Sequence, residues 1–379
     1  MKVILAFDSF KGSISAQDAC KAAAESIRLV DKDAEIISCP MSDGGEGFVD
    51  VLQASTKCAV VTKYITGPCR ENIFASYLWI EEDKTAIIES ATACGLPLVP
   101  VDKRNPSELS TFGVGQLIMD AKNRGAKKII IGIGGTATVD GGVGMLVCAG
   151  WIFLNENGKE IEPVGSNLGE IAKIIPGERF AGIEIIIASD VTNSLTGEHG
   201  AAFVYGPQKG ADPEMCEMLD KGMKKYAKVM ASVINFDYND SPGAGAAGGI
   251  GFALIAAFQG KFIPGADIVM QVSGFDDAIC GADLVITGEG RTDAQTAKGK
   301  LPARVAQKAQ QNGISCILLS GALGDGWRQV YDVGVTAVFS ILDHPQSLYM
   351  AMNNAEEQLK TATENAVRLF IANKKIGPE

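Results

Sequence analysis

The fold class is set by residues 1–38, MKVILAFDSFKGSISAQDACKAAAESIRLVDKDAEIIS. The apolar run at 3–7 is typical of a buried strand, and a polar turn follows it at 8–12. Ser15, with an acidic residue three positions later, resembles a capping box, so we expect a helix to about residue 30. A second apolar run at 34–38 predicts another strand. Strand, helix and strand in this order open an α/β fold.

The same rhythm recurs elsewhere in the chain. The glycine-rich loop MSDGGEG, at 41–47, precedes a helix that we expect to begin at Phe48. Three apolar runs near the C-terminus predict further strands, at 284–287, 316–320 and 335–340. Because strands alternate with helices at both ends of the chain, we predict a parallel sheet in a discontinuous α/β domain of residues 1–65 and 273–379.

The middle of the chain has a different pattern. Short alternating segments predict antiparallel strands, at 60–65, 73–80 and 85–89. Buried strands are also expected at 128–133 and 183–188, the first of them after a helical segment. We therefore predict an inserted, mixed α/β domain of residues 66–272.

One final helix is expected near the C-terminus. Its apolar residues recur at spacings of four and three, which indicates a single packed face. These residues are Leu348, Met352, Ala355, Leu359, Ala362, Ala366 and Leu369.

Composition narrows the possible functions. The 379 residues carry a net charge of −11 without a basic stripe, which argues against a nucleic-acid partner. No apolar run approaches the ~18 residues of a membrane span, so no membrane partner is expected. The nine cysteines form no CxxC pair, and Met1 leads directly into a strand. Free cysteines and the lack of a signal peptide predict a cytoplasmic protein.

Five apolar strands end in small or acidic residues. In open α/β sheets, ligands bind beyond the carboxyl ends of the strands, where glycine allows close approach and helix N-termini attract anions. For any one such loop a tight turn is the better explanation, but several loops with charged residues favour a binding site. The residues at these ends are Asp8, Gly134, Gly135, Asp190, Glu289 and Gly321.

The loop DGGEG, residues 43–47, places two carboxylates beside glycines at a helix start. Bare carboxylates repel phosphate, so this loop suits Mg²⁺ binding or contact with a neutral hydroxyl. The alternative is an acidic helix N-terminus that the helix dipole stabilises. This loop alone does not separate the two interpretations.

Three cations and one acid stand out in other loops. Lys11 and Lys209 could balance the charge of a phosphate or carboxylate, or could be ordinary surface lysines. Arg291 could bind a carboxylate or phosphate through two hydrogen bonds. Asp190 ends an apolar strand, so it is a candidate general base or metal ligand, with a buried turn cap as the alternative.

Familiar nucleotide motifs are missing or out of place. The chain has no GxxxxGK[ST] loop and no protein-kinase signature. GAGAAG at 243–248 matches GxGxxG, but no apolar strand precedes it, so a dinucleotide site is not expected. Close packing of small residues explains this segment better.

Taken in order, the loops resemble those of the bacterial glycerate kinases of the glycerate 2-kinase type. The resemblance extends over nearly the whole chain. The segments that carry it are 8–13, 42–47, 134–142, 190–193, 206–211, 243–251 and 287–293. Two departures are Val139, where the family usually has Asn, and Ser194, where it usually has Pro.

This resemblance implies two α/β domains, one of them flavodoxin-like (Rossmann-like) and built from both chain ends. It also implies ATP and Mg²⁺ as cofactors and D-glycerate as substrate, phosphorylated at O2 to give 2-phosphoglycerate. Three alternatives stay open: an enzyme that makes 3-phosphoglycerate, a kinase for another small hydroxy acid, and a non-catalytic ligand-binding homologue. The oligomeric state, a homodimer included, is also open.

Roles for single residues follow from this reading. We expect Asp190 to act as base or orienting group at the glycerate hydroxyl, and Lys11 and Arg291 to balance charge. Asp43 and Asp293 would hold Mg²⁺. The other expected substrate or nucleotide contacts are Asp8, Ser9, Gly44, Gly45, Glu46, Gly134, Gly135, Thr136, Asn193, Lys209, Gly288, Glu289 and Gly290.

Overall fold

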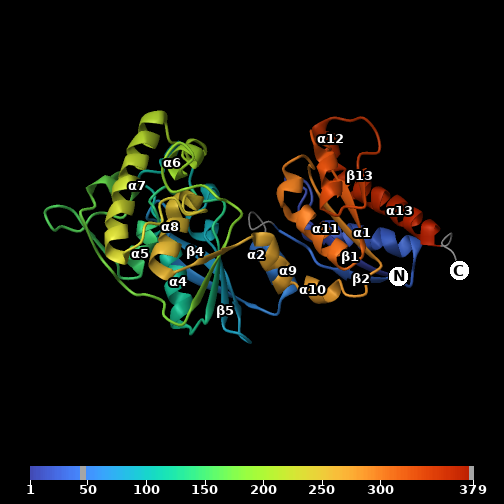
Figure 1. The fold of residues 1–379 in the computed structure, drawn as a ribbon, viewed down its shortest axis with the longest axis horizontal. Coiled ribbons are helices and arrows are strands. Elements are labelled where there is room, and N and C mark those ends of the chain that lie inside the picture. The colour runs from blue at the N-terminus through green and yellow to red at the C-terminus, as the bar shows by residue number, and fades with distance from the viewer. Residues whose placement is uncertain (43–47, 375–379) are drawn as a thin grey trace. The chain divides into compact units, whose positions relative to one another are not determined.

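The structure is a computed structural model, and it describes residues 1–42 and 48–374. The chain divides into two compact units, each with its own sheet (Figure 1). The first unit comprises Met1–Asp43, Asp50–Thr56 and Ala266–Glu379. The second comprises Gly44–Val49 and Lys57–Gly265. An α/β fold with a parallel sheet from both chain ends and an inserted mixed sheet is confirmed.

The first unit holds a five-stranded sheet in the order β13-β12-β11-β1-β2, and every neighbouring pair is parallel. Numbered within this unit, the order is 2-1-3-4-5, which is the flavodoxin-like arrangement. The central strands β1, β11 and β12 are largely buried, as expected for a parallel sheet covered on both faces, whereas the edge strands β2 and β13 are partly exposed. The strands are β1 (Lys2–Phe7), β2 (Glu35–Ser38), β11 (Leu284–Glu289), β12 (Ser315–Ser320) and β13 (Ala337–Ser340).

Helices cover this sheet. The first begins at the predicted cap, where the Ser15 side chain accepts a hydrogen bond from the Asp18 N–H. Helices α1 and α13, from opposite ends of the chain, lie side by side (Figure 1). The helices of this unit are α1 (Ala16–Val30), α2 (Phe48–Ser55), α9 (Gly265–Val272), α10 (Phe275–Ala278), α11 (Leu301–Gln311), α12 (Leu348–Asn353) and α13 (Ala355–Lys374), with 3-10 turns η6 (Thr296–Lys298) and η7 (Trp327–Val333).

The prediction of one final helix is wrong. Asn354 ends α12 with φ −103° and ψ 8°, and α13 begins at the next residue. Leu359 is buried in the core, whereas Leu348 in α12 and Leu369 in α13 are exposed, so the predicted apolar residues do not form one packed face. Spacing alone could not reveal the break, because Asn is tolerated both in helices and at their ends.

The second unit holds a six-stranded sheet in the order β10-β9-β6-β5-β4-β3. The pairs β3–β4 and β4–β5 are antiparallel, as predicted, and the remaining pairs are parallel. The strands are β3 (Ala59–Thr66), β4 (Asn72–Ile80), β5 (Thr85–Glu89), β6 (Lys128–Gly132), β9 (Glu184–Ala188) and β10 (Lys261–Ile263), with a separate pair β7 (Ile152–Leu154) and β8 (Lys173–Ile175).

Helix α7 in this unit was not predicted, although its start has a clear signal. Asp212 accepts a hydrogen bond from the Met215 N–H, and Pro213 occupies the first turn. The helices are α3 (Ala91–Cys94), α4 (Phe112–Asn123), α5 (Val143–Cys148), α6 (Ala201–Tyr205), α7 (Pro213–Ile234) and α8 (Ile250–Phe258), with 3-10 turns η1 (Leu96–Leu98), η2 (Val101–Lys103), η3 (Gly165–Glu170), η4 (Pro207–Lys209) and η5 (Ala246–Gly249).

The compact units differ from the predicted boundaries at both ends of the insert. Strand β3 belongs to the second unit because it pairs with β4 along its whole length. Helix α9 falls almost entirely in the first unit, although the sequence placed it in the insert. The division at residues 65 and 273 stays a prediction for domains that fold separately. Across residues 1–42 and 48–374, no helix is long and apolar enough to cross a membrane.

The glycine-rich segment at 243–251 packs closely, as predicted, and does not follow a strand. A Cβ at Gly245 would lie 2.1 Å from the Ser194 carbonyl oxygen, and one at Gly248 would lie 2.1 Å from the Thr138 carbonyl oxygen. These contacts bring backbone against backbone. The segment therefore supports the loops after β6 and β9 by packing.

We predict that Gly248→Ala destabilises the protein far more than Gly158→Ala. Both glycines have a positive φ, 70° and 73°, but a Cβ at Gly158 meets no atom within 4 Å. The left-handed backbone alone should cost Gly158→Ala about 1 kcal/mol. The added clash should cost Gly248→Ala about 3 kcal/mol or more of the free energy of unfolding. Urea denaturation measures both values, and equal losses would contradict the packing argument.

Candidate active site

A pocket of about 510 Å³ lies in the first unit at the carboxyl ends of β1, β11, β12 and β13. The strand order reverses between β1 and β11, and open α/β sheets bind ligands at such a point. The lining residues are Asp8, Ser9, Phe10, Lys11, Ser13, Glu289, Gly290, Arg291, Asp293, Lys300, Gly321, Ala322, Ile341, Leu342, Leu348, Ala351, Met352 and Ala355.

Close backbone contacts hold the strand-end loops together. The Asp8 N–H donates to the Gly288 carbonyl at 2.9 Å. A Cβ at Gly321 would lie 2.5 Å from the carbonyl oxygen of Gly290, and a Cβ at Gly290 would lie 3.5 Å from the Lys11 nitrogen. The loops after β1, β11 and β12 therefore converge because small residues allow their backbones to approach.

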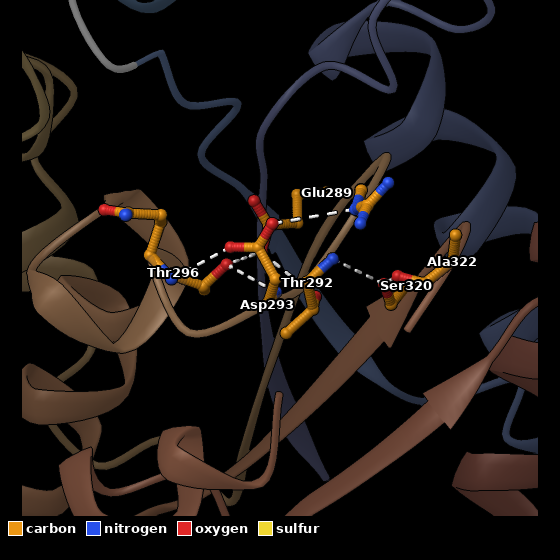
Figure 2. A network of polar contacts seen from close by, with 8 residues as sticks. Glu289, Thr292, Asp293, Thr296, Ser320 and Ala322 are labelled. Atoms are coloured by element: carbon orange, nitrogen blue, oxygen red, sulfur yellow. Dashed lines mark hydrogen bonds and ion pairs between the residues drawn. The ribbon is translucent and has the colours of Figure 1, made fainter. Parts of the chain in front are cut away.

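Glu289 is the most deeply placed acid of the pocket, with 7% of its surface exposed. Its Oε1 accepts hydrogen bonds from the hydroxyls of Thr292 at 3.0 Å and Thr296 at 2.6 Å (Figure 2). Oε2 accepts no hydrogen bond from any residue that the structure describes. Burial raises the pKa of Glu289 above its ordinary value, and the two threonine hydroxyls oppose this rise. One carboxylate oxygen is thus held in place while the other is left for a ligand.

The loops after β11 and β12 are joined by a second set of hydrogen bonds (Figure 2). The Ser320 hydroxyl accepts from the Thr292 N–H at 3.2 Å and donates to the Ala322 carbonyl at 2.7 Å. The Gly324 N–H donates to the Thr292 carbonyl at 2.8 Å. Thr292 therefore fixes both the Glu289 side chain and the path of the loop around it.

Arg291 and Asp293 lie at the rim of the pocket. The Arg291 Nε is 3.6 Å from Asp293 Oδ2, and 68% of the arginine side chain is exposed. A Cβ at Gly324 would lie 3.0 Å from Arg291 Nε, so the arginine lies across this glycine. An exposed ion pair of this kind contributes little stability, which leaves the guanidinium available to an anion. Lys11 and Lys300 add two further exposed cations to the same pocket.

The second unit gathers another set of predicted residues at the end of β6. Lys209 is only 2% exposed, and its Nζ donates to Thr136 Oγ1 at 3.0 Å and to the Thr138 carbonyl at 2.8 Å. Gly134 and Gly135 precede Thr136 in this loop. Burial lowers the pKa of Lys209 to about 8, although the charges of Cys94 and Asp140 act in the opposite direction. Lys209 is therefore not a surface lysine.

Asp140 accepts hydrogen bonds that stabilise the same loop after β6. Its Oδ2 accepts from the N–H and hydroxyl of Thr111 and from the Gly144 N–H, and its Oδ1 accepts from the Gly142 N–H. The side chain is fully buried. These four donors stabilise the loop after β6, so this acid has a structural role.

The two predicted residues after β9 differ in their surroundings. Asp190 is exposed at the end of the strand. Asn193 donates from Nδ2 to the His199 carbonyl at 2.8 Å and accepts at Oδ1 from the Tyr205 hydroxyl at 2.8 Å. Both polar groups of Asn193 therefore hold its loop, and substrate contact by this residue stays a prediction.

The predicted site residues fall into four groups. Asp8, Ser9, Lys11, Glu289, Gly290, Arg291 and Asp293 share the pocket of the first unit, whereas Asp190, Asn193, Lys209, Gly134, Gly135 and Thr136 belong to the second unit. Gly288 lies inside β11, where a Cβ would be 2.4 Å from the Leu319 carbonyl oxygen, so it serves sheet packing. Asp43, Gly44, Gly45 and Glu46 lie outside the described residues.

Sequence reasoning missed one side of the pocket. Lys300 and the apolar residues of α12, α13 and the end of β13 were not predicted as site residues. Lys300 follows a glycine and precedes a helix start, which is a weak signal. The apolar residues gave no such signal, because an apolar helix face usually packs in the hydrophobic core.

Known proteins with similar sequences show which family this chain belongs to. The family described as the glycerate kinase family matches residues 3–371. The chain belongs to the glycerate kinase family. A glycerate kinase from Bacillus cereus is 43% identical over 373 residues, covering 98% of each chain. A glycerate 2-kinase from Escherichia coli K12 is 40% identical over 368 residues, which cover 96% of this chain and 97% of that one.

A solved structure also resembles this glycerate kinase family member. It is a crystal structure of a Salmonella typhimurium LT2 protein provisionally assigned as glycerate kinase 2, with a TM-score of 0.89 and 38% identity. The match covers 99% of this chain and all of the other. The two-unit α/β architecture is therefore shared with an experimentally observed fold.

We predict that Lys209 makes the protein more stable as the pH rises from about 8 to about 10.5. Over this window the unfolded chain keeps the lysine protonated, whereas the folded protein has released the proton. Unfolding then takes up a proton, so the free energy of unfolding rises with pH until the unfolded lysine also titrates. The cost of burying the charge is thus removed above the folded-state pKa.

Urea denaturation of the wild type and of Lys209→Met at several pH values tests this. The free energy of unfolding of the wild type, minus that of the variant, should rise by up to about 3 kcal/mol across the window. Lys221→Met, at an exposed lysine of α7, is the control and should show no such rise. A pH-independent difference for Lys209→Met would contradict the prediction.

Proposed function

We propose that this protein transfers the γ-phosphoryl group of ATP to the O2 hydroxyl of D-glycerate, giving ADP and 2-phosphoglycerate. The observation that carries the proposal is the match of residues 3–371 to the glycerate kinase family. A relative named glycerate 2-kinase, 40% identical over 96% of this chain, favours O2 over O3. A cytoplasmic location accords with the use of ATP.

The pocket of the first unit suits the charges of this reaction. Phosphoryl transfer depends mainly on positioning and on neutralising the charge of the phosphoryl oxygens. Lys11, Arg291 and Lys300 bring three cations to one pocket. The Arg291 side chain is 68% exposed, and its Nε lies 3.6 Å from the partly exposed carboxylate of Asp293. It can therefore donate two hydrogen bonds to phosphoryl or carboxylate oxygens.

Asp190 is the proposed base or orienting group. As the O2–phosphorus bond forms and the bond from the γ-phosphorus to ADP breaks, the hydroxyl proton has to leave O2. An exposed carboxylate at a strand end can accept that proton or orient the hydroxyl. Lys209 and Thr136 would add polar contacts to an anionic ligand at the end of β6, since Nζ has three N–H donors and two protein acceptors.

Mg²⁺ is part of the proposal. The described residues contain no group of three or more histidine, cysteine, aspartate or glutamate side chains that could hold a metal ion. Kinase Mg²⁺ sites need only one or two carboxylates, with substrate phosphates and waters as the other ligands. Asp293 at the pocket rim fits this requirement, because its carboxylate is partly exposed and, among the described residues, contacts Arg291 and the Gln295 N–H. Bound Mg²⁺ would neutralise charge on the phosphates.

The direct test is ATP plus D-glycerate coupled to enolase without a phosphoglycerate mutase. Only 2-phosphoglycerate is an enolase substrate, so a signal establishes both activity and position. A signal that requires added mutase would indicate 3-phosphoglycerate instead. ATP consumption with another hydroxy acid but not with glycerate would identify that acid, instead of glycerate, as the substrate. Consumption with none of the acids would indicate a binding homologue.

We predict that Asp190→Asn lowers kcat by roughly a hundredfold or more and changes KM for D-glycerate only slightly. A positioned base contributes about this much to a rate, and its loss affects the transition state more than ground-state binding. Steady-state kinetics in the coupled assay measure both constants. Asp102→Asn, at an exposed acid of the same unit, is the matched control. Near-normal turnover by Asp190→Asn would remove this residue from the mechanism.

We predict that Asp293→Asn raises the Mg²⁺ concentration for half-maximal activity about tenfold, because one carboxylate ligand is lost. ADP formation, followed by chromatography without a coupling enzyme, measures this concentration. The control is Asp325→Asn, at an exposed acid that does not line the pocket. An unchanged Mg²⁺ dependence in Asp293→Asn would exclude Asp293 as a ligand.

A further inference from the structure

The pocket of the first unit has two chemically different sides. One side is charged and comes from the loops after β1 and β11. The other, which we name the apolar wall, comes from the end of β13 and from α12 and α13. The apolar wall comprises Ile341, Leu342, Leu348, Ala351, Met352 and Ala355.

The apolar wall is fixed to the loop after β1. The Ser13 hydroxyl donates to the Met352 carbonyl at 2.5 Å, and a Cβ at Gly12 would lie 2.8 Å from Met352 Cε. The Ser347 hydroxyl accepts a hydrogen bond from the Met350 N–H at 3.3 Å and caps α12. Helix α12 ends at Asn354, and α13 begins at Ala355, which also lines the pocket, and buries Leu359 in the core. The wall is therefore a built feature of the site.

Part of the apolar wall is exposed to solvent. Leu348 is 76% exposed although it lines the pocket, and Leu342 is 40% exposed. Covering such surface with an apolar ligand group is favourable. Glycerate is a small acid with two hydroxyls and has no apolar face to place there. Adenine has flat, largely apolar faces, and a pocket of about 510 Å³ is within the range of nucleotide-sized ligands.

Glu289 supplies a second feature that suits a nucleoside. Thr292 and Thr296 hold its Oε1, so Oε2 is presented at the end of β11 beside the strand-order reversal. In dinucleotide folds, an acidic side chain near such a reversal accepts hydrogen bonds from ribose hydroxyls. A neutral hydroxyl pair is also a better partner for this buried carboxylate than a phosphate, which it would repel.

We propose that this pocket binds the adenosine part of the phosphoryl donor. The base lies against the apolar wall, the ribose hydroxyls donate to Glu289, and the phosphates extend toward Lys11, Arg291 and Lys300. This assignment rests on the proposed kinase function, and it goes further by placing the nucleotide, rather than glycerate, in the first unit.

Two neighbouring residues of α12 provide a matched test. Leu348 and Tyr349 are both 76% exposed, but only Leu348 lines the pocket. Leu348→Ser should weaken ADP binding several-fold, and Ala351→Trp, which fills the base site, should weaken it by at least roughly tenfold. Tyr349→Ser should leave it unchanged. Isothermal titration of ADP into the full chain without glycerate measures these affinities, and thermal unfolding verifies that each variant is folded.

The outcomes separate this inference from the proposed function. Weaker ADP binding in Leu348→Ser and Ala351→Trp, with an unchanged KM for D-glycerate, supports it. Unchanged ADP affinity in both variants overturns the inference. A raised KM for D-glycerate with normal ADP affinity also overturns it, because the pocket would then bind glycerate. A wild type that binds no ADP overturns it too. A wild type that binds ADP through this pocket but phosphorylates no glycerate would refute the proposed activity and retain the nucleotide site.

Discussion

The parallel pairing of β1 with β11 is the interaction on which the first unit depends. It aligns Val3 with Leu284 and Phe7 with Gly288, although the two strands are about 280 residues apart in sequence. Two side-chain contacts reinforce the pairing, from the Thr287 hydroxyl to the Ala6 carbonyl and from the Lys2 N–H to the Asp283 carboxylate, both at 2.7 Å. Closing so long a loop costs conformational entropy that grows only slowly with length, and prior folding of the insert would shorten the effective loop. Without this pairing, neither the strand-order reversal nor its pocket would exist.

The chemistry of the pocket follows from that alignment. Since β1 and β11 end at the same edge, the cation-bearing loop of Lys11 and the acidic loop of Glu289 meet there. Glycines at 290 and 321 allow the loops to converge, and threonines rather than cations hold the buried carboxylate. Glu289 therefore forms no ion pair among the described residues, and Lys11, Arg291 and Lys300 line the same pocket. In the second unit the buried charged group is a lysine instead of a carboxylate. Lys209 donates hydrogen bonds to the Thr136 hydroxyl and the Thr138 carbonyl.

A division of labour between phosphate chemistry and base recognition fits the surfaces of the first unit. Charged groups act on the phosphoryl oxygens, where positioning and charge neutralisation matter most. In the proposed site, exposed apolar side chains of α12 would contribute binding energy to a part of the nucleotide that does not react. Binding energy from such a remote group can position the reacting atoms. In the proposed site, the break at Asn354 lets α12 contribute apolar side chains to the pocket, which a continuous helix packed on the core would not do.

The amino-acid sequence by itself determined the alternation of strands and helices, the cap at Ser15, the antiparallel strands after residue 59 and the family, since these depend on the order and spacing of neighbouring residues. It also identified the residues Asp8, Lys11, Glu289, Arg291 and Asp293, which the structure brings into one pocket. Only the tertiary structure decided that α12 ends at Asn354 to form the apolar wall, that Lys209 is buried, and that Gly288 and Asn193 serve packing and loop contacts. The burial of Lys209 and the packing of Gly288 depend on contacts with residues far along the chain, Thr136 and Leu319, which local spacing cannot reveal. The contacts of Asn193 with His199 and Tyr205 and the end of α12 are local, but the residue types there are compatible with more than one loop or helix conformation.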